Sequence, residues 1–385
     1  MSYVRIPCTF MRGGTSNALV FLRKDLPANE DEWPGIFLRA MGSPDPNGRQ
    51  LDGMGGGISS LSKVCVVSPP SRDDADIDYS FFQIGVTDDL VDTSGNCGNM
   101  SSAMGPFAYD EGMTPRATGA EAVVRIHNTN TRKIIRSRFP VEDGLAQVVG
   151  DQVIDGVSGS GAPIRLEFLE PGGAGTGKLL PAGGQARSTL TVEGVGEVTA
   201  TMIDAANPCV FISPEILGKD GTEHPEAIEA DKATMEKLEA IRCQASIAMG
   251  IAKTVEEAGR IPSIPKVAMV FTPRPTVTLS GTTMGPDDFD IGVRMVSIGK
   301  PHRAVPLTGA LCLAVAVRTP GSLPAELAHA TDGAIRVGHP SGTLEVDAEV
   351  QQTKDGPKAT HGAVYRTTRR LFEGQVLIPA KRTSA

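Results

Sequence analysis

Two short apolar segments, each preceded by a loop of small and polar residues, constrain the fold more than any other feature of the sequence. The first reads GNCGNMSSAMGPFA from position 95, and the second reads GKPHRAVPLTGALCLAVA from position 299. An apolar run opened in this way is typical of a helix that is buried on every side. Each helix follows a strand pattern and a polar loop, so the sequence predicts an internal duplication. Two such helix N-termini would favour an anionic ligand, because their N–H groups are unpaired and the helix dipole is positive there.

Most of the remaining chain consists of short β-like runs separated by turn residues. The 44 glycines and 28 prolines show no period, which indicates tight turns between strands rather than a fibrous repeat. Helical spacing of apolar residues is clear at 30–42, where Gly42 ends the pattern, and at 233–250. A chain of 385 residues is too long for one ordinary core. We therefore expect a β-rich α+β or α/β fold with two domains.

Charge and cysteine content exclude several classes of protein. The formal net charge is −8 and no cluster of five or more Lys and Arg residues is visible, so we expect no nucleic-acid partner. The longest apolar runs fall well short of the ~20 residues that span a bilayer, and Arg5 and Arg12 interrupt any signal-peptide pattern. We expect no membrane segment and a cytoplasmic location. The six cysteines form no CxxC pair and no histidine lies at metal-ligand spacing, which favours a reduced protein without a metal.

The segment GNCGNMSSA at 95–103 is the part of the sequence most informative about chemistry. Glycines beside Cys97 let the backbone approach a ligand closely, and a helix N-terminus stabilises a thiolate. The same glycines and asparagines would also serve as a plain turn and helix cap, so these residues alone leave both interpretations open. The other cysteines lie mostly in apolar runs, which is typical of buried structural thiols.

Lys63 lies where a glycine-rich loop, GGGISSLSK, enters an apolar strand. Partial burial favours the neutral form of an amine, which can remove a proton. The alternative is a lysine at a strand edge whose ammonium group simply reaches water.

Three further segments carry polar side chains of interest. RGGTS at 12–16 offers hydroxyls and glycine amides for a carboxylate, or only a turn between strands. His302 and Arg303 precede the second apolar helix and could pair with a substrate carboxylate or lie in a solvated loop. GGAGTGK at 172–178 has the spacing of a phosphate-binding loop, but Leu179 stands where Ser or Thr is needed and Pro181 interrupts the required helix. We therefore expect no nucleotide there.

Together these motifs resemble the 2-methylaconitate cis/trans isomerase (PrpF-like) family. The matching strings run in order from residue 11 to about residue 374. They are MRGGTS, MGSPD, LDGMGGGISSLSKV, VDTSGNCGNMSSAMGPFA, SGSGAPIRLEFLEPGG, TGKLLP, IDAANPCVFI, GKPHRAVPLTGALCLAVA and RRLFEG.

The resemblance implies a diaminopimelate-epimerase fold with two similar domains, each a curled sheet around a central helix, and an active site in the cleft between them. The first domain would cover residues 1–185 with return strands at about 360–385, and the second would cover 186–359. The epimerases carry a second catalytic cysteine at the second helix, where this chain has Thr308 and Gly309. Two-thiol epimerisation is therefore disfavoured.

The same resemblance assigns roles to particular residues. It implies that Lys63 and Cys97 are the acid and base, in an order that the sequence leaves open. The residues that we expect around the substrate are Ser16, Ser62, Asn96, Gly98, Asn99, Asn207, His302, Arg303, Thr308 and Gly309.

The function implied is isomerisation of an unsaturated di- or tricarboxylate by an allylic proton shift or a cis/trans change, without a metal or an organic cofactor. The activity implied is most like that of 2-methylaconitate isomerase, and relatives on the same scaffold include 3-methylitaconate isomerase. The alternatives are 4-oxalomesaconate tautomerisation in aromatic-acid breakdown and non-catalytic binding of such acids. The intact Lys63 and Cys97 count against the non-catalytic alternative. Many members continue GGTS with Lys-Gly, whereas this chain has Asn17 and Ala18, which leaves the substrate open. The expected partner is a small polycarboxylate. The sequence leaves the oligomeric state undetermined, with a homodimer as one possibility.

Overall fold

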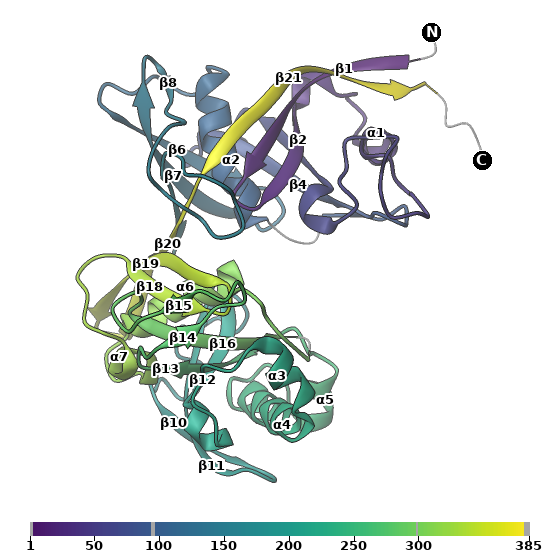
Figure 1. Ribbon diagram of the computed structural model, residues 1–385. Coiled ribbons are helices and arrows are strands. Elements are labelled where there is room, and N and C mark those ends of the chain that lie inside the picture. Colours follow the sequence, from purple (N-terminus) through teal and green to yellow (C-terminus); the bar gives the residue numbers. More distant parts are fainter. Residues whose placement is uncertain (1–2, 94–96, 298, 381–385) are drawn as a thin grey trace. The chain divides into compact units, whose positions relative to one another are not determined.

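The computed structural model describes residues 3–93, 97–297 and 299–380, which form two compact units (Figure 1). Unit 1 contains the residues up to 167 together with those from 365 onward, and unit 2 contains 168–364. The chain passes between the units within strands β9 (Ile164–Leu169) and β20 (Gly356–Arg366). Unit 1 is therefore completed only by the C-terminal part of the chain.

Unit 1 is built on a mixed sheet in which the first and last strands of the chain pair. β1 and β21 run antiparallel side by side (Figure 1), and the strand order continues as β21–β1–β2–β3–β4–β6–β7. Two of these pairings are parallel, β2 with β3 and β4 with β6, and the others are antiparallel. The elements of unit 1 are β1 (Tyr3–Gly13), β2 (Ser16–Leu22), α1 (Trp33–Met41), β3 (Lys63–Ser68), β4 (Ile77–Ile84), β5 (Val91–Asp92), α2 (Gly98–Asp110), β6 (Glu121–Asn128), β7 (Lys133–Glu142), β8 (Leu145–Ala146) and β21 (Thr368–Pro379).

The two faces of this sheet bury different helices. Alternate side chains of β2 and β3, such as Phe21 and Val64, pack with Phe37 of α1 in one apolar cluster. Because successive side chains of a strand point to opposite faces, Lys63 and Cys65 lie on the other face. That face covers α2, which contacts β1, β2, β3, β6 and β7.

Unit 2 repeats the plan of unit 1. Its order β10–β11–β12–β13–β16–β18–β19 has parallel pairings at β12–β13 and β16–β18, and antiparallel pairings elsewhere. The parallel and antiparallel pairings therefore follow the same sequence in both units. The elements of unit 2 are β10 (Ser188–Val192), β11 (Gly196–Ala205), β12 (Asn207–Ile212), α3 (Pro225–Ala230), α4 (Lys232–Ala248), α5 (Val255–Gly259), β13 (Lys266–Phe271), β14 (Thr276–Val277), β15 (Thr283–Met284), β16 (Ile291–Ser297), β17 (Lys300–Pro301), α6 (Leu307–Val317), α7 (Leu323–Leu327), β18 (Ile335–His339) and β19 (Gly342–Thr353).

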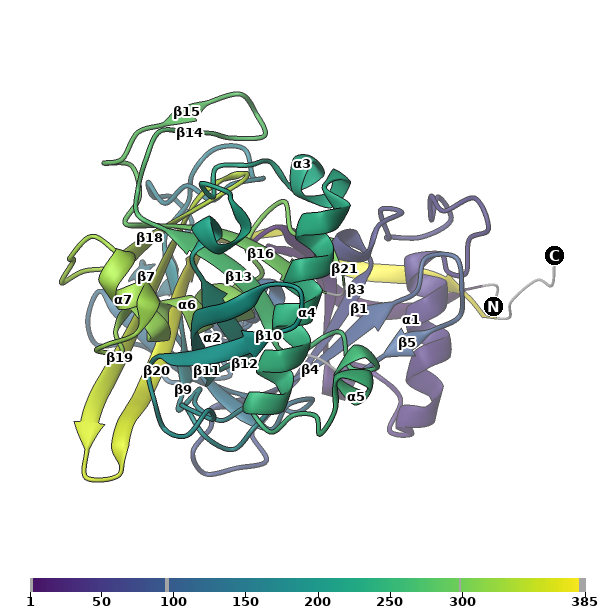
Figure 2. The same ribbon diagram turned by 90° about the horizontal axis from the view of Figure 1, so that it is seen from below.

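The faces of the second sheet are divided in the same way. α4 crosses the strands of unit 2 (Figure 2) and shares an apolar cluster with Val210 of β12 and Val267 of β13. The neighbouring residues Cys209 and Lys266 therefore face away from α4. α6 contacts β11, β12 and β19, and its sequence is buried from Gly309 to Ala316.

The predictions of an α+β fold, an internal duplication and two buried central helices are confirmed. The expected helix at 233–250 is α4, and Gly42, with a φ of 77°, ends α1 as predicted. In the ranges described above, no helix is both long and apolar enough to cross a membrane.

Backbone amides of the glycine-rich loop GGAGTGK donate hydrogen bonds to a carboxylate of the protein itself. The Oδ2 atom of Asp204 accepts hydrogen bonds from the backbone N–H groups of Gly175 and Thr176, at 2.8 and 2.7 Å, and from the Thr176 hydroxyl at 2.8 Å. Asp204 is fully buried. A carboxylate of the protein thus occupies the amides that a phosphate would need, in agreement with the sequence-based rejection of a nucleotide site.

This arrangement predicts that Asp204→Ala destabilises unit 2. The variant leaves two loop amides and a hydroxyl without their acceptor, and we expect a loss of about 1–3 kcal/mol in the free energy of unfolding. Urea denaturation measures the loss, with Asp355→Ala in an exposed turn as the control. Equal midpoints for the two variants would contradict this role of Asp204.

Candidate functional site

Lys63 is held at the start of β3 on the face that covers α2. Its side chain is only 7% exposed, and its Nζ atom lies 5.2 Å from the centre of the Phe81 ring. Nζ donates a hydrogen bond to Oε1 of Gln83, its cross-strand neighbour on β4. No carboxylate among the described residues forms an ion pair with Lys63. The structure therefore shows a buried amine with a neutral partner rather than a solvated lysine.

Gln83 is itself fixed by the loop that precedes Lys63. Its Nε2 atom donates to the carbonyl oxygens of Ser59 and Ser62, each at 3.0 Å. These two acceptors orient the amide so that Oε1 faces Lys63. The Ser62 hydroxyl lies 2.6 Å from Oε1 of Gln50, so this predicted substrate contact organises the loop.

Cys97 is the N-cap residue of α2, and its side chain makes no capping hydrogen bond. It is half-buried, whereas the other five cysteines are buried and all six are free thiols. Burial raises the pKa of the Cys65 thiol, the proximity of Cys97 raises it further, and Lys63 acts in the opposite direction. Lys63 and Cys97 therefore both lie near Cys65 in unit 1.

The RGGTS turn packs against the first turn of α2. A Cβ atom on Gly13 would lie 2.6 Å from the carbonyl oxygen of Asn99, so a glycine is required there. Asn99 donates from Nδ2 to the Thr15 hydroxyl at 3.0 Å. Ser16, which follows, is buried, and Gly98 is the first residue of the helix. These predicted substrate contacts are therefore neighbours of Cys97 in space.

Arg366 is a residue of this site that the sequence did not reveal. It is buried, with its Nε atom 3.2 Å from Oδ1 of Asn99 and its Nη1 atom 2.9 Å from the Tyr365 carbonyl oxygen. Burial lowers the pKa of the Arg366 guanidinium to about 10, and the nearby Cys97 partly offsets this effect. No acidic side chain of the described residues pairs with Arg366. No local motif marks it, because only the returning C-terminal strands place it beside α2.

The predicted residues of unit 2 lie near the start of α6 or beside it. Thr308 and Gly309 are in the first turn of α6, and Asn207 begins β12 and donates to the Pro208 carbonyl oxygen. His302 follows β17, and burial, reinforced by Lys266, lowers the pKa of its imidazole.

Two of the predicted substrate contacts, Arg303 and Asn96, are not placed at the site by the structure. Arg303 is exposed and forms an ion pair with Glu226 at the surface. Asn96 lies outside the described residues.

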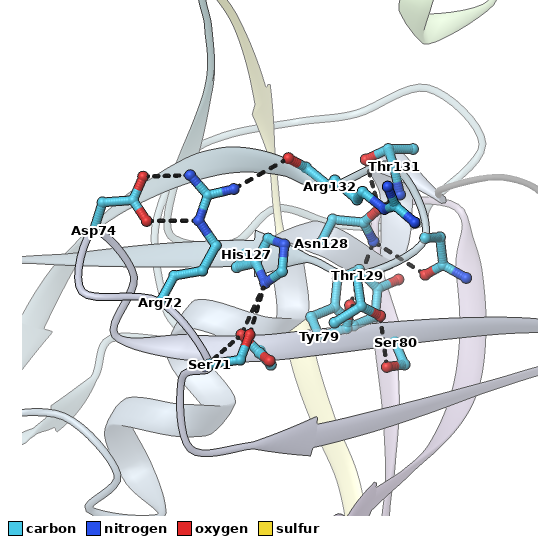
Figure 3. Close-up of polar contacts among 12 residues, drawn as sticks. Ser71, Arg72, Asp74, Tyr79, Ser80, His127, Asn128, Thr129, Thr131 and Arg132 are labelled. Carbon is cyan, nitrogen blue, oxygen red and sulfur yellow. Dashed lines mark hydrogen bonds and ion pairs between the residues drawn. The ribbon is translucent and has the colours of Figure 1, made fainter.

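A second polar cluster of unit 1, drawn in Figure 3, has the composition of a catalytic triad but lacks its geometry. Nδ1 of His127 lies 2.9 Å from Oδ1 of Asp78 and 3.5 Å from the hydroxyl of Ser71. In a triad, Asp and Ser contact different ring nitrogens, whereas here both contact Nδ1. Around it, Asn128 and Thr131 bond within the turn between β6 and β7. The cluster holds loops together.

The arrangement around Cys97 suits proton transfer on an anionic carbon acid. It combines a buried amine, a thiol at a helix N-terminus and a buried guanidinium, which can supply a base, an acid and an electrostatic anchor for a carboxylate. Within the described ranges, no group of three His, Cys, Asp or Glu side chains could hold a metal ion.

Comparison with known proteins agrees with this reading of the motifs. The family model described as PrpF protein matches residues 3–379. A 3-methylitaconate isomerase of Eubacterium barkeri is 38% identical, with 97% of each chain covered. A 2-methyl-aconitate isomerase of Cupriavidus necator is 40% identical, with 98% of each chain covered.

One solved structure is similar throughout its length. A crystal structure of methylitaconate-delta-isomerase aligns with a TM-score of 0.91 at 37% identity and covers 98% of this chain and 97% of its own. The predicted family and the predicted isomerase class are thus confirmed, and this chain belongs to the PrpF protein family of isomerases.

Proposed function

We propose that this protein moves a proton along an unsaturated di- or tricarboxylate, with Lys63 and Cys97 as the acid/base pair and no cofactor. The observation that carries the proposal is their joint position on the α2 face of unit 1, where Arg366 adds a buried positive charge. The names of the relatives support an acid such as 2-methylaconitate or 3-methylitaconate.

The chemistry needs three groups. One group removes a proton from a carbon next to the double bond, and the electron pair spreads over the double bond and the conjugated carboxylate. A second group returns a proton to the same or the far allylic carbon, which changes the geometry or moves the double bond. A cation at the carboxylate stabilises the intermediate charge. No net proton is consumed.

Lys63 is suited to either proton step because its hydrogen-bond partner is neutral. Gln83 accepts from the ammonium form, and it leaves no carboxylate charge behind when the proton departs. Cys97 is suited to the complementary step because its side chain is half-buried at the N-terminus of α2 and lies near the guanidinium of Arg366.

Arg366 completes this arrangement. Its Nε and Nη1 atoms are committed to neutral acceptors, and Nη2 has no protein acceptor in the described part of the chain. That edge of the guanidinium is available to a carboxylate of the substrate.

Turnover in deuterium oxide tests the proposal. We expect the purified protein to convert 2-methylaconitate or 3-methylitaconate, as followed by proton NMR and mass spectrometry. Retention of the original proton means that one group carries it between carbons faster than it exchanges with solvent, whereas uptake of one deuterium means that this group exchanges with solvent or that a second group delivers the proton. Conversion of 4-oxalomesaconate alone would identify a tautomerase. If none of the three acids reacts or exchanges, the proposal is wrong.

Lys63→Met should abolish proton transfer while the fold survives. Methionine keeps an unbranched side chain against Phe81, and loss of a general acid or base commonly lowers kcat by a factor of about 100 or more. Steady-state kinetics and thermal melting measure the two effects, with Lys24→Met on an exposed turn as the matched control. A normal kcat in the Lys63 variant would remove the lysine from the mechanism.

Cys97 should be the first thiol to react with limiting iodoacetamide. The other five thiols are buried, whereas Cys97 is partly accessible at the N-terminus of α2. Peptide mapping by mass spectrometry identifies the labelled residue, and the converted acid should protect it. Cys97→Ser serves as the control, because it should remain unlabelled under the same conditions. Preferential labelling of Cys8 or Cys243 would contradict the assignment.

A further inference from the structure

The side chain of Asn99, in the first turn of α2, uses both ends of its amide on neighbours within unit 1. Its Oδ1 atom accepts a hydrogen bond from Nε of Arg366 at 3.2 Å, and its Nδ2 atom donates to the hydroxyl of Thr15 at 3.0 Å. The amide thus joins the start of α2 to two segments that lie far apart in the sequence. An amide with both ends engaged in this way is suited to hold its two partners in place.

The RGGTS turn is shaped to pack directly against this pair of side chains. Gly14 is buried and has a φ of 51°. A Cβ atom on Gly14 would lie 2.3 Å from Oδ1 of Asn99 and 3.2 Å from Cδ of Arg366. Any residue other than glycine would therefore displace the amide and crowd the guanidinium side chain.

The same turn is also tied to the segment that carries Arg366. Nη1 of Arg12 donates to the carbonyl oxygens of Gly14 and Thr367, at 2.9 and 3.0 Å. The N–H group of Gly14 donates to the Thr367 carbonyl oxygen at 3.0 Å. Because Thr367 directly follows Arg366 in the sequence, these bonds fix the backbone from which the guanidinium extends.

The hydrogen-bond partners of Arg366 in this arrangement are neutral. Its guanidinium bonds to Oδ1 of Asn99 and to the Tyr365 carbonyl oxygen, and no acidic side chain of the described residues pairs with it. An arginine that is only 9% exposed would ordinarily be paired with an acid. Aspartate is nearly the size of asparagine and would supply that acid. The asparagine instead orients the guanidinium and leaves its charge uncompensated.

We propose that Asn99 is a positioning residue whose neutral amide orients the guanidinium of Arg366 and leaves its positive charge for the anionic substrate. The nature of the ligand rests on the proposed function. Asn99, which we expected among the residues around the substrate, thus acts through Arg366 and takes no part in proton transfer. The glycines that precede Thr15 in RGGTS serve this arrangement, because they let the turn approach Asn99.

Asn99→Asp tests this role with almost no change in size. The new carboxylate can still accept from Nε of Arg366, and it can accept from the Thr15 hydroxyl, but it compensates the buried charge. We expect the ligand-free variant to melt about 2–4 °C higher than the wild type. In calorimetric titration it should bind tricarballylate, a saturated triacid with no double bond to shift, about tenfold or more weakly. Asn29→Asp, the same exchange at an exposed helix cap of unit 1, should change neither quantity.

Kinetics with the acid that the protein converts gives the second readout. Asn99→Asp should raise KM by about tenfold or more, with kcat within a few-fold of the wild type, whereas Lys63→Met should lower kcat. If Asn99→Asp melts lower than the wild type or does not fold, Thr15→Val replaces it. That variant removes only the hydroxyl that holds Nδ2 of Asn99, and it should weaken tricarballylate binding by about threefold.

The positioning role is overturned if Asn99→Asp, or Thr15→Val where it is used, binds tricarballylate as the wild type does. A wild type that binds no tricarballylate, or a fall in kcat at constant KM in the Asn99 variant, would overturn it as well. If Asn99→Asp melts higher and binds tricarballylate more weakly but the wild type converts no acid, the positioning role stands and the proposed isomerisation fails.

Discussion

Each sheet of this protein has to cover a helix that is apolar on nearly all sides, and this constraint decides where polar chemistry can occur. α2 is buried from Met100 to Tyr109 and α6 from Gly309 to Ala316, so the bodies of both helices serve only packing. Their first turns are the places where backbone N–H groups remain unpaired within the helix. Polar side chains that approach these helices therefore gather at their N-terminal ends. The position of Cys97 at the N-cap of α2 follows from this requirement.

The second recurring feature is a buried or half-buried cation with neutral partners. Lys63 bonds to Gln83, Lys266 bonds to Ser297, and the guanidinium of Arg366 bonds to an asparagine oxygen and a carbonyl oxygen. Burial of an uncompensated charge costs several kcal/mol even after relaxation. Three such groups near the starts of central helices are difficult to explain as contributions to stability. In unit 1, the anionic substrate of the proposed function would supply the charge that Lys63 and Arg366 lack.

The sequence predicted the architecture well because the relevant signals are local. Each helix could be predicted from residues within or beside it. These signals are the apolar run LTGALCLAVAV, the spacing of apolar residues in α4 and the glycine after α1. Lys63 and Cys97 were found for the same reason, since each lies in a short motif beside glycines. Arg366 was missed because its importance depends on the return of the C-terminal strands to unit 1, far from Asn99 in sequence. The equivalent positions of Lys63 and Lys266 likewise appear only when the strand registers of the two units are compared.

The two units share one architecture but carry different side chains at some equivalent positions. Ser16 and Asn207 begin equivalent strands, and Lys63 and Lys266 begin the next equivalent pair. The difference lies at the helix starts, where unit 1 has Cys97 and unit 2 has Pro306. A proline lacks both a nucleophilic side chain and an N–H group, so the second helix start cannot exchange a proton as a thiol does. In the proposed function the acid/base pair therefore belongs to unit 1, because its central helix begins with a thiol, whereas the equivalent position of α6 is a proline.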